Sequence, residues 1–425
     1  MNLKLLLTGN ELMTGDTLDS NSAMIAKMSL DAGIQVNYKA TVSDDIDQLV
    51  SEISRLSETS EALIVNGGLG PTTDDLTAQA LAIAMDVTLE EHPVAIKHLV
   101  EWCAKRNYGL SEANRKQAIL PKGVEIVANA NGSAVGFKVK LNGCLIFCTP
   151  GVPHELKTMM AQEILPQLSK LLPNTHRPKR VRFRVFGYGE SNLQELITKS
   201  YPNWPEQLEL GFRASMPLLE LKLKVDHQED HALLDDWQAK IKALVGAHIV
   251  TDDNRSLARV VVDLLTKQNK TITFAESCTG GKIASLLTEV SGASSVFEAG
   301  YVSYSNKVKT NLLNVSENDL AEQGAVSETV VRQMLSGALK ASGAEVGVSV
   351  SGIAGPNGGT ADKPVGTVYL AWGSQTSMQA GAFYFPGNRI FFQQIVSALA
   401  LDLVRRDLLG LEEVPIYFKE RKISK

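Results

Sequence analysis

The sequence is poor in cysteine, has no excess of basic residues and contains no long apolar run. Four cysteines in 425 residues do not make a disulfide framework, so we expect buried thiols in a reducing compartment. The net charge of −5 provides no basic field, so no direct nucleic-acid partner is expected. No apolar stretch approaches the roughly 20 residues of a membrane helix, which predicts no membrane partner. The first residues, MNLKLLLTGN, reach Gly and Asn too soon for a signal-peptide core, so we expect a cytoplasmic protein.

Strand and helix patterns alternate along most of the chain. A length of 425 residues is too great for one ordinary core, so two or three domains are expected. In 1–172 and in 255–425, short apolar runs alternate with amphipathic stretches, which predicts α/β domains with parallel sheets covered by helices on both faces. Residues 178–250 show alternating strand patterns and a helix pattern, typical of a small α+β module. The segment Leu171–Arg180, which mixes Pro, Asn and basic residues, is interpreted as a linker.

The segment AESCTGGK, Ala275–Lys282, invites comparison with a phosphate-binding P-loop. In the P-loop template, Gly and four residues precede Gly-Lys and then Ser or Thr, but Glu276 and Ile283 occupy two of those defining positions. A nucleoside-triphosphate site, and with it a phosphoryl-transfer enzyme, is therefore disfavoured. A glycine turn between a strand and a helix still directs N–H groups at a phosphate or a developing oxyanion. The alternative is that Ser277 and Thr279 only cap the following helix, as these residue types often do.

A serine nucleophile at position 277 would need a base, and the C-terminal block contains no histidine after His248. Lys307 and Lys309, which follow the next strand pattern, are the remaining candidates. A lysine can act as a base near neutral pH only if its pKa falls by about 3 units from ~10.4, which burial or a nearby cation can cause. The alternative interpretation is that both lysines are solvated residues at the start of a helix.

Three ordered motifs of the last block resemble the C-terminal domain of the CinA (competence/damage-inducible) family: AESCTGG, GYVSYSNKVK, and SGIAGPNGG followed by KPVGTV. The resemblance implies an amidohydrolase that converts nicotinamide mononucleotide to nicotinate mononucleotide and ammonia without a cofactor. It makes Ser277 the nucleophile and Lys309 its base, with Tyr304 nearby. The implied substrate and oxyanion shell comprises Thr279, Gly280, Gly281, Ser351, Gly352, Gly355 and Arg389. The family pattern has Thr where Ser351 stands and a second Arg where Gln393 stands.

The first block is similar to the other half of full-length members of this family, a molybdopterin-binding-like fold. The matching segments are GNELMTGDTLDSN, GGLGPTTDDLT and PGVPHEL. The resemblance implies an ADP-ribose pyrophosphatase that uses a divalent metal such as Mg²⁺, and a homodimer. The implied nucleotide-binding residues are Asn10, Gly67, Gly68, Gly70 and Thr73, and the implied metal ligands are Asp74, Asp75, Glu11 and Asp16.

The loop GGLGPTTDD follows a strand pattern and opens a helix pattern, so its N–H groups would face an anion. Asp74 and Asp75 are expected in the first helical turn. There they would either complement the helix dipole or hold magnesium against phosphate oxygens. The family has Gly-Thr-Ala-Pro-Gly where this chain has Gly-Ser-Ala-Val-Gly, with Ser133 and Val135 in the changed positions. The alternative to a catalytic domain is a module that binds a nucleotide or pterin without turning it over.

Overall fold

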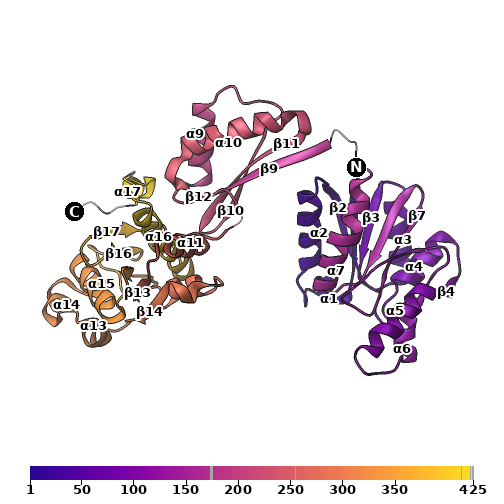
Figure 1. Cartoon of the computed structure of the whole chain (residues 1–425), viewed down its shortest axis with the longest axis horizontal. Helices are drawn as coiled ribbons and strands as arrows, with labels where there is room; N and C mark the ends of the chain where they lie inside the picture. Colours follow the sequence, from indigo (N-terminus) through magenta and orange to yellow (C-terminus); the bar gives the residue numbers. More distant parts are fainter. Residues whose placement is uncertain (173–175, 254, 413, 422, 424–425) are drawn as a thin grey trace. The chain divides into compact units, whose positions relative to one another are not determined.

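The chain divides into two units, Met1–Pro178 with Asp226–Gln228, and Lys179–Val225 with Glu229–Lys425. The computed structural model describes residues 1–172, 176–253, 255–412, 414–421 and 423 (Figure 1). Within these residues, no helix is both long enough and apolar enough to pass through a membrane. Of the segment interpreted as a linker, 173–175 lie outside the described residues, and its basic part from His176 onward belongs to a strand.

The first unit is built on a six-stranded sheet with the order β2-β1-β3-β8-β7-β6. Its parallel strands are β1 (Leu3–Thr8), β2 (Val36–Val42), β3 (Ala62–Asn66) and β8 (Cys144–Thr149). Alternate residues of β1 enter two separate cores, Leu6 on one face and Leu5 on the other, so both faces are buried. Helices α3 (Ile46–Ser57), α4 (Thr77–Met85) and α5 (Pro93–Ala104) supply one core, and α2 (Ser20–Asp31), α7 (Pro153–Met159) and α8 (Leu165–Ser169) supply the other.

The sheet is mixed rather than wholly parallel, because β7 (Gly136–Leu141) and β6 (Glu125–Val127) run antiparallel to their neighbours. The two residues between β7 and β8 are Asn142 and Gly143, with φ of 53° and 83°. Positive φ at both central positions is the geometry of a type I′ hairpin turn, for which Asn-Gly is the preferred sequence. The sequence therefore dictates the antiparallel pair at this edge.

Residues around the expected middle module form a four-stranded sheet with the order β10-β11-β9-β12, most of which belongs to the second unit. Its strands are β9 (His176–Val185), β10 (Glu209–Ser215), β11 (Leu218–His227) and β12 (Ile249–Thr251). Helices α9 (Glu190–Ser200) and α10 (His231–Val245) pack on one face around a core that includes Phe183, Leu221 and Trp237.

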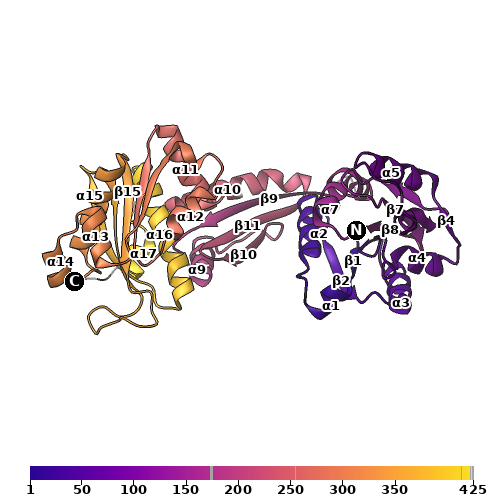
Figure 2. The ribbon, with the colours of Figure 1, turned by 90° about the horizontal axis from the view of Figure 1, so that it is seen from below.

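The remainder of the second unit is a three-layer α/β domain, with α13 and α15 on one side of its sheet and α16 on the other (Figure 2). The sheet order is β14-β13-β15-β16-β17, with the first three strands parallel and the last two antiparallel. The strands are β13 (Ile272–Glu276), β14 (Phe297–Val302), β15 (Val346–Gly352), β16 (Thr367–Gly373) and β17 (Met378–Tyr384). The helices are α11 (Leu257–Gln268), α12 (Lys282–Thr288), α13 (Asn306–Leu313), α14 (Glu317–Gln323), α15 (Glu328–Ser342), α16 (Arg389–Leu408) and α17 (Ile416–Glu420).

A buried polar cluster joins this domain to the end of the four-stranded sheet. The Asp402 carboxylate, which is 0% exposed, accepts hydrogen bonds from Arg405, Arg406 and the Tyr417 hydroxyl. Arg405 also donates to the carbonyl of Ala247, at 2.6 Å. A buried carboxylate is tolerated only when its charge is compensated, and here two guanidinium groups do so.

Helix α15 fixes the position of α13 through one close backbone contact. A Cβ on Gly337 would lie only 2.0 Å from the carbonyl oxygen of Leu313. We expect Gly337→Ala to destabilise the protein by about 1–3 kcal/mol through overpacking, although alanine normally favours a helix interior by about 1 kcal/mol. Urea unfolding measures the change. Gly109→Ala is the control, since its Cβ would meet nothing within 4 Å, and an equal effect in both variants would contradict the role assigned to this contact.

Candidate functional site

Glu276 is one of the two residues that depart from the P-loop template. Its carboxylate lies at the start of α12, where a P-loop would bind a phosphate. Glu276 ends β13, is 1% exposed, and accepts hydrogen bonds from the amides of Gly281, Ile283 and Ala284 at 3.0, 3.1 and 2.9 Å. These are the N–H groups that a helix leaves unpaired at its start. The negative charge that helix α12 prefers is therefore supplied by the protein itself. The alternative in which Ser277 and Thr279 cap this helix does not hold.

Ser277, the residue that follows Glu276, contacts Lys309 of α13. Lys309 Nζ is 3.0 Å from Ser277 Oγ, 2.7 Å from the carbonyl oxygen of Ser303 and 3.3 Å from that of Tyr304. The lysine is 1% exposed, and this burial lowers its pKa because desolvation disfavours the ammonium form. Lys307, two residues earlier on α13, is exposed to solvent.

The glycines of the turn give it its shape, but their N–H groups are already used. Gly280 and Gly281 have φ of 64° and 94°, in the left-handed region that disfavours other residues. The Gly280 amide donates to the carbonyl of Ser277 and the Gly281 amide to Glu276, so neither is available as the oxyanion donor expected from the sequence. The amides of Cys278 and Thr279, in contrast, donate to no other residue within the described part of the chain.

Cys278 and Thr279 differ in how their side chains are accommodated. The Thr279 hydroxyl is buried and has no hydrogen-bond partner among the described residues. Burial of Cys278 raises the pKa of its thiol to about 12, so the thiol stays protonated at neutral pH. A sulfur nucleophile at this turn is thereby disfavoured.

The remaining residues expected around this site fall into two groups. Arg389, at the start of α16, donates to the Tyr304 hydroxyl at 2.7 Å and to the carbonyl of Gly355 at 3.0 Å, so these three come together. Ser351 instead donates to the carbonyl of Ala325 and is 1% exposed. Gly352 closes β15 against β16, where a Cβ would lie 2.8 Å from the carbonyl oxygen of Thr367.

Gln393, which stands where the family has arginine, contacts the turn of residues 277–281 directly. This turn is called the nucleophile turn, after the role expected for Ser277. The Gln393 side-chain amide donates to the carbonyl of Cys278 at 3.0 Å. The sequence identified this position as a departure from the family but did not show what the new side chain does. The contact ties α16 to the residue that follows Ser277.

The first unit has a cleft of about 590 Å³ at the carboxyl ends of its parallel strands. Ends of parallel strands are where open α/β sheets bind ligands. Of the residues expected there, the lining includes Glu11, Gly67, Gly68, Gly70, Asp74 and Asp75, whereas Asn10, Thr73 and Asp16 lie outside it. It also includes Ser133 of the changed loop, while Val135 is buried in the core.

Two carboxylates of this cleft were missed by the sequence reasoning. Asp44 follows β2 and accepts hydrogen bonds from the Thr8 hydroxyl and the Asn10 amide, at 2.5 and 3.0 Å. Glu155, which accepts from the Asn129 side chain at 2.7 Å, lies within the PGVPHEL motif. The position of Asp44 just beyond a parallel strand was the signal that could have identified it.

The expected metal ligands do not assemble as a set. Asp74 and Asp75 precede α4, which begins at Thr77, and both accept from the Thr72 hydroxyl in a turn instead of lying in the first helical turn. That hydrogen bond lowers the pKa of Asp74. Across the ranges that the structure describes, no group of three or more His, Cys, Asp or Glu side chains is placed to hold a metal ion. A divalent ion here would need donors from a substrate, as magnesium bound to phosphates commonly has.

Comparisons with known proteins agree with this two-part organisation. Residues 254–408 match the model of the CinA C-terminal domain, and residues 4–170 match that of a probable molybdopterin binding domain. A CinA-like protein of Colwellia psychrerythraea is 51% identical over 425 residues, 99% of this chain and 98% of the relative. One from Citrifermentans bemidjiense is 38% identical over 98% of this chain and 99% of its own. The crystal structure of the competence/damage inducible protein CihA from Agrobacterium tumefaciens is 38% identical, covers 37% of this chain and 94% of its own, and has a TM-score of 0.35.

The Glu276 cap generates a stability prediction. In Glu276→Gln the side-chain NH₂ replaces one acceptor oxygen and faces backbone N–H donors, so we expect a loss of about 1–3 kcal/mol of unfolding free energy. Glu289→Gln is the matched control, because Glu289 directly follows α12 and is exposed. Thermal and urea unfolding compare the two. If Glu276→Gln is as stable as the control, the carboxylate does not hold this turn.

Proposed function

The chain belongs to the CinA family, and we propose that its C-terminal domain hydrolyses the carboxamide of nicotinamide mononucleotide to nicotinate mononucleotide and ammonia. The observation that carries this proposal is the 3.0 Å contact between Ser277 Oγ and a buried Lys309 Nζ. A neutral amine has two N–H donors and one lone pair. The carbonyls of Ser303 and Tyr304 accept the two N–H groups, which leaves the lone pair for the serine hydroxyl.

In the first half of the reaction, Ser277 Oγ attacks the carboxamide carbon and its proton passes to Lys309 Nζ. The carbonyl oxygen becomes an oxyanion, for which the amides of Cys278 and Thr279, which donate to no other described residue, are candidate donors in this turn. When the tetrahedral intermediate collapses, the C–N bond breaks and Lys309 returns the proton to the leaving nitrogen, which departs as ammonia. An ester of Ser277 remains.

In the second half, water attacks the ester carbon while Lys309 accepts one of its protons. The C–O bond to Ser277 then breaks, the serine regains its proton, and nicotinate mononucleotide leaves as the carboxylate. Neither half needs a metal or a redox cofactor. Arg389, which is exposed and held by Tyr304 and Gly355, offers its positive charge to the substrate phosphate.

Removal of either member of the pair tests the mechanism. We expect Ser277→Ala and Lys309→Ala each to lower kcat for ammonia release by about 10³-fold or more, since nucleophile and base act as a unit. Lys307→Ala on the same helix is the control and should keep wild-type turnover, and a chelator should have no effect. Wild-type turnover by Ser277→Ala would show that the hydroxyl is not the nucleophile.

The pH dependence of kcat/KM for ammonia release by the wild-type enzyme tests whether Lys309 is the base. Lys309 acts as a base only when neutral, and burial lowers its pKa below the ordinary ~10.4. We therefore expect kcat/KM to rise with pH until that lowered pKa is passed and then to level off. A rise that continues unchanged to pH values above ~10.4 would mean that the lysine is not perturbed.

A second function is favoured by the cleft of about 590 Å³ in the first unit. We propose that it holds ADP-ribose and cleaves it to AMP and ribose 5-phosphate. A divalent ion such as Mg²⁺ would be bound by Asp74 or Glu11 together with the diphosphate oxygens, where it would neutralise charge. Homodimerisation and a cytoplasmic location belong to the same proposal for this family.

This second function is tested by incubating the full chain with ADP-ribose and Mg²⁺. We expect AMP to form, to disappear when the metal is chelated, and to fall by about 10²-fold or more in Asp74→Asn, since a lost metal contact removes charge stabilisation. Asp16→Asn, which lies outside the cleft lining, is the control. Measurable binding of ADP-ribose without AMP for any divalent metal would instead favour a non-catalytic binding module.

A further inference from the structure

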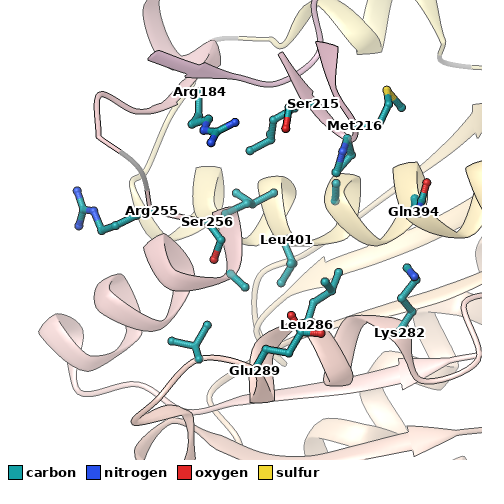
Figure 3. A pocket seen from close by; sticks show the side chains of 16 residues that line it. Arg184, Ser215, Met216, Arg255, Ser256, Lys282, Leu286, Glu289, Gln394 and Leu401 are labelled. Atoms are coloured by element: carbon teal, nitrogen blue, oxygen red, sulfur yellow. The ribbon is translucent and has the colours of Figure 1, made fainter. Parts of the chain in front are cut away.

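We propose that a second pocket of the C-terminal unit, away from Ser277, binds a nucleoside monophosphate and acts on the nucleophile turn. The pocket has a volume of about 510 Å³, within the range of about 300–1,000 Å³ typical of small-molecule sites. It lies between the turn that joins β10 to β11 and the helices α11, α12 and α16 (Figure 3). None of the residues expected from the sequence to form a site lines it.

Two cations extend into this pocket from opposite sides. In Figure 3 the Arg184 side chain reaches in from β9 and that of Lys282 from the first residue of α12, whereas Arg255 points away. Arg255 is engaged by Asp253 and Asp263. The backbone amide of Lys282 donates to the carbonyl of Thr279, but its ammonium group has no hydrogen bond or ion pair with any residue that the structure describes. Its charge is therefore available to an anion.

Arg184 is not neutralised by its one acidic contact. Its Nη1 lies 3.3 Å from Glu220, but that buried carboxylate is shared with Arg213 and Lys222 at 3.2 and 2.9 Å. Because three cations share one carboxylate, the positive charge of Arg184 in the pocket is only partly compensated. The remaining positive charge makes a phosphate group the ligand that fits here.

The rest of the lining explains why the ligand should be a mononucleotide rather than free phosphate or a polyphosphate. Leu257, Leu286 and Leu401 provide an apolar wall on which a base can lie. The Glu289 carboxylate, also part of the lining, accepts hydrogen bonds from ribose hydroxyls or an exocyclic amine. The same carboxylate repels additional phosphates. With only two inward cations, a single phosphate is the best match.

The pocket shares two elements with the site at Ser277. Lys282 directly follows Gly281, whose amide is held by Glu276. On α16, Gln394 lines the pocket while its neighbour Gln393 donates to the carbonyl of Cys278. A ligand that binds Lys282 and Gln394 therefore contacts the direct neighbours of Gly281 and Gln393. Through them it can shift the hydrogen bonds from Gly281 to Glu276 and from Gln393 to Cys278. This coupling rests on the proposed deamidase, whereas the binding itself does not.

Isothermal titration of AMP into the full-length protein tests the binding. We expect saturable binding to wild type, weakened at least tenfold in Lys282→Gln and in Arg184→Gln. Lys267→Gln is the matched control, because Lys267 is an exposed lysine of α11 outside the pocket and should bind as wild type does. Adenosine and inorganic phosphate should each bind at least tenfold more weakly than AMP, since each engages half of the pocket.

AMP binding that is unchanged in both Lys282→Gln and Arg184→Gln would place the ligand elsewhere and overturn the proposal. Inorganic phosphate binding as tightly as AMP would overturn the assignment of a nucleoside ligand. Circular dichroism checks that both variants are folded, and Lys282, which is partly exposed, can be replaced without opening the core.

The coupling is read from ammonia release with nicotinamide mononucleotide as substrate. We expect AMP to change the KM at least threefold in wild type and in Lys267→Gln, but not in Lys282→Gln. Inhibition that persists in Lys282→Gln would show competition at Ser277 and exclude the coupling. If no variant releases ammonia, the deamidase proposal fails while the titration still decides whether the pocket binds AMP.

Discussion

The arrangement around Ser277 depends on the hydrogen bonds between the Glu276 carboxylate and the start of α12. Three amides point at one buried carboxylate, and these hydrogen bonds stabilise the turn between β13 and α12 in the form seen here. That form places Ser277 beyond the strand end and leaves the amides of Cys278 and Thr279 unused. A phosphate could bind the amides at the start of α12 only if it displaced the Glu276 carboxylate. The Glu276 carboxylate therefore disfavours triphosphate binding at this turn, and it holds the turn that presents Ser277 for the proposed acyl chemistry.

The second constraint is the burial of Lys309. Helix α13 presents it to Ser277 because α15 approaches closely at Gly337, which lets the two helices pack without an intervening side chain. Burial removes the water that would stabilise an ammonium ion, and two backbone carbonyls fix the direction of the amine. Packing at Gly337 thus contributes to the burial that lowers the pKa of Lys309.

The sequence was sufficient for the fold class, since strand and helix patterns are local. Residue patterns alone left both Lys307 and Lys309 as candidate bases, and only the family resemblance indicated Lys309. The choice depends on which side of α13 faces the sheet, and the folded chain buries Lys309 and exposes Lys307. The sequence also could not show that Glu276 takes the amides first offered to a ligand, or that Thr72 holds Asp74 and Asp75 in a turn before α4. The alternation of strand and helix patterns predicted a parallel sheet, whereas Asn142 and Gly143 form the turn of an antiparallel hairpin. At Glu276 and Thr72, what was missed is a competition between hydrogen-bond partners, which only the folded chain decides.

The burial of Cys278 has a consequence for the conditions under which the site can work. A thiol with a pKa of about 12 has almost no thiolate at neutral pH, and thiolate is the form that peroxides and alkylating electrophiles attack. The other three cysteines are buried as well. If Ser277 and Lys309 act as proposed, their site lies next to a sulfur that stays protonated and would tolerate oxidants that inactivate cysteine hydrolases.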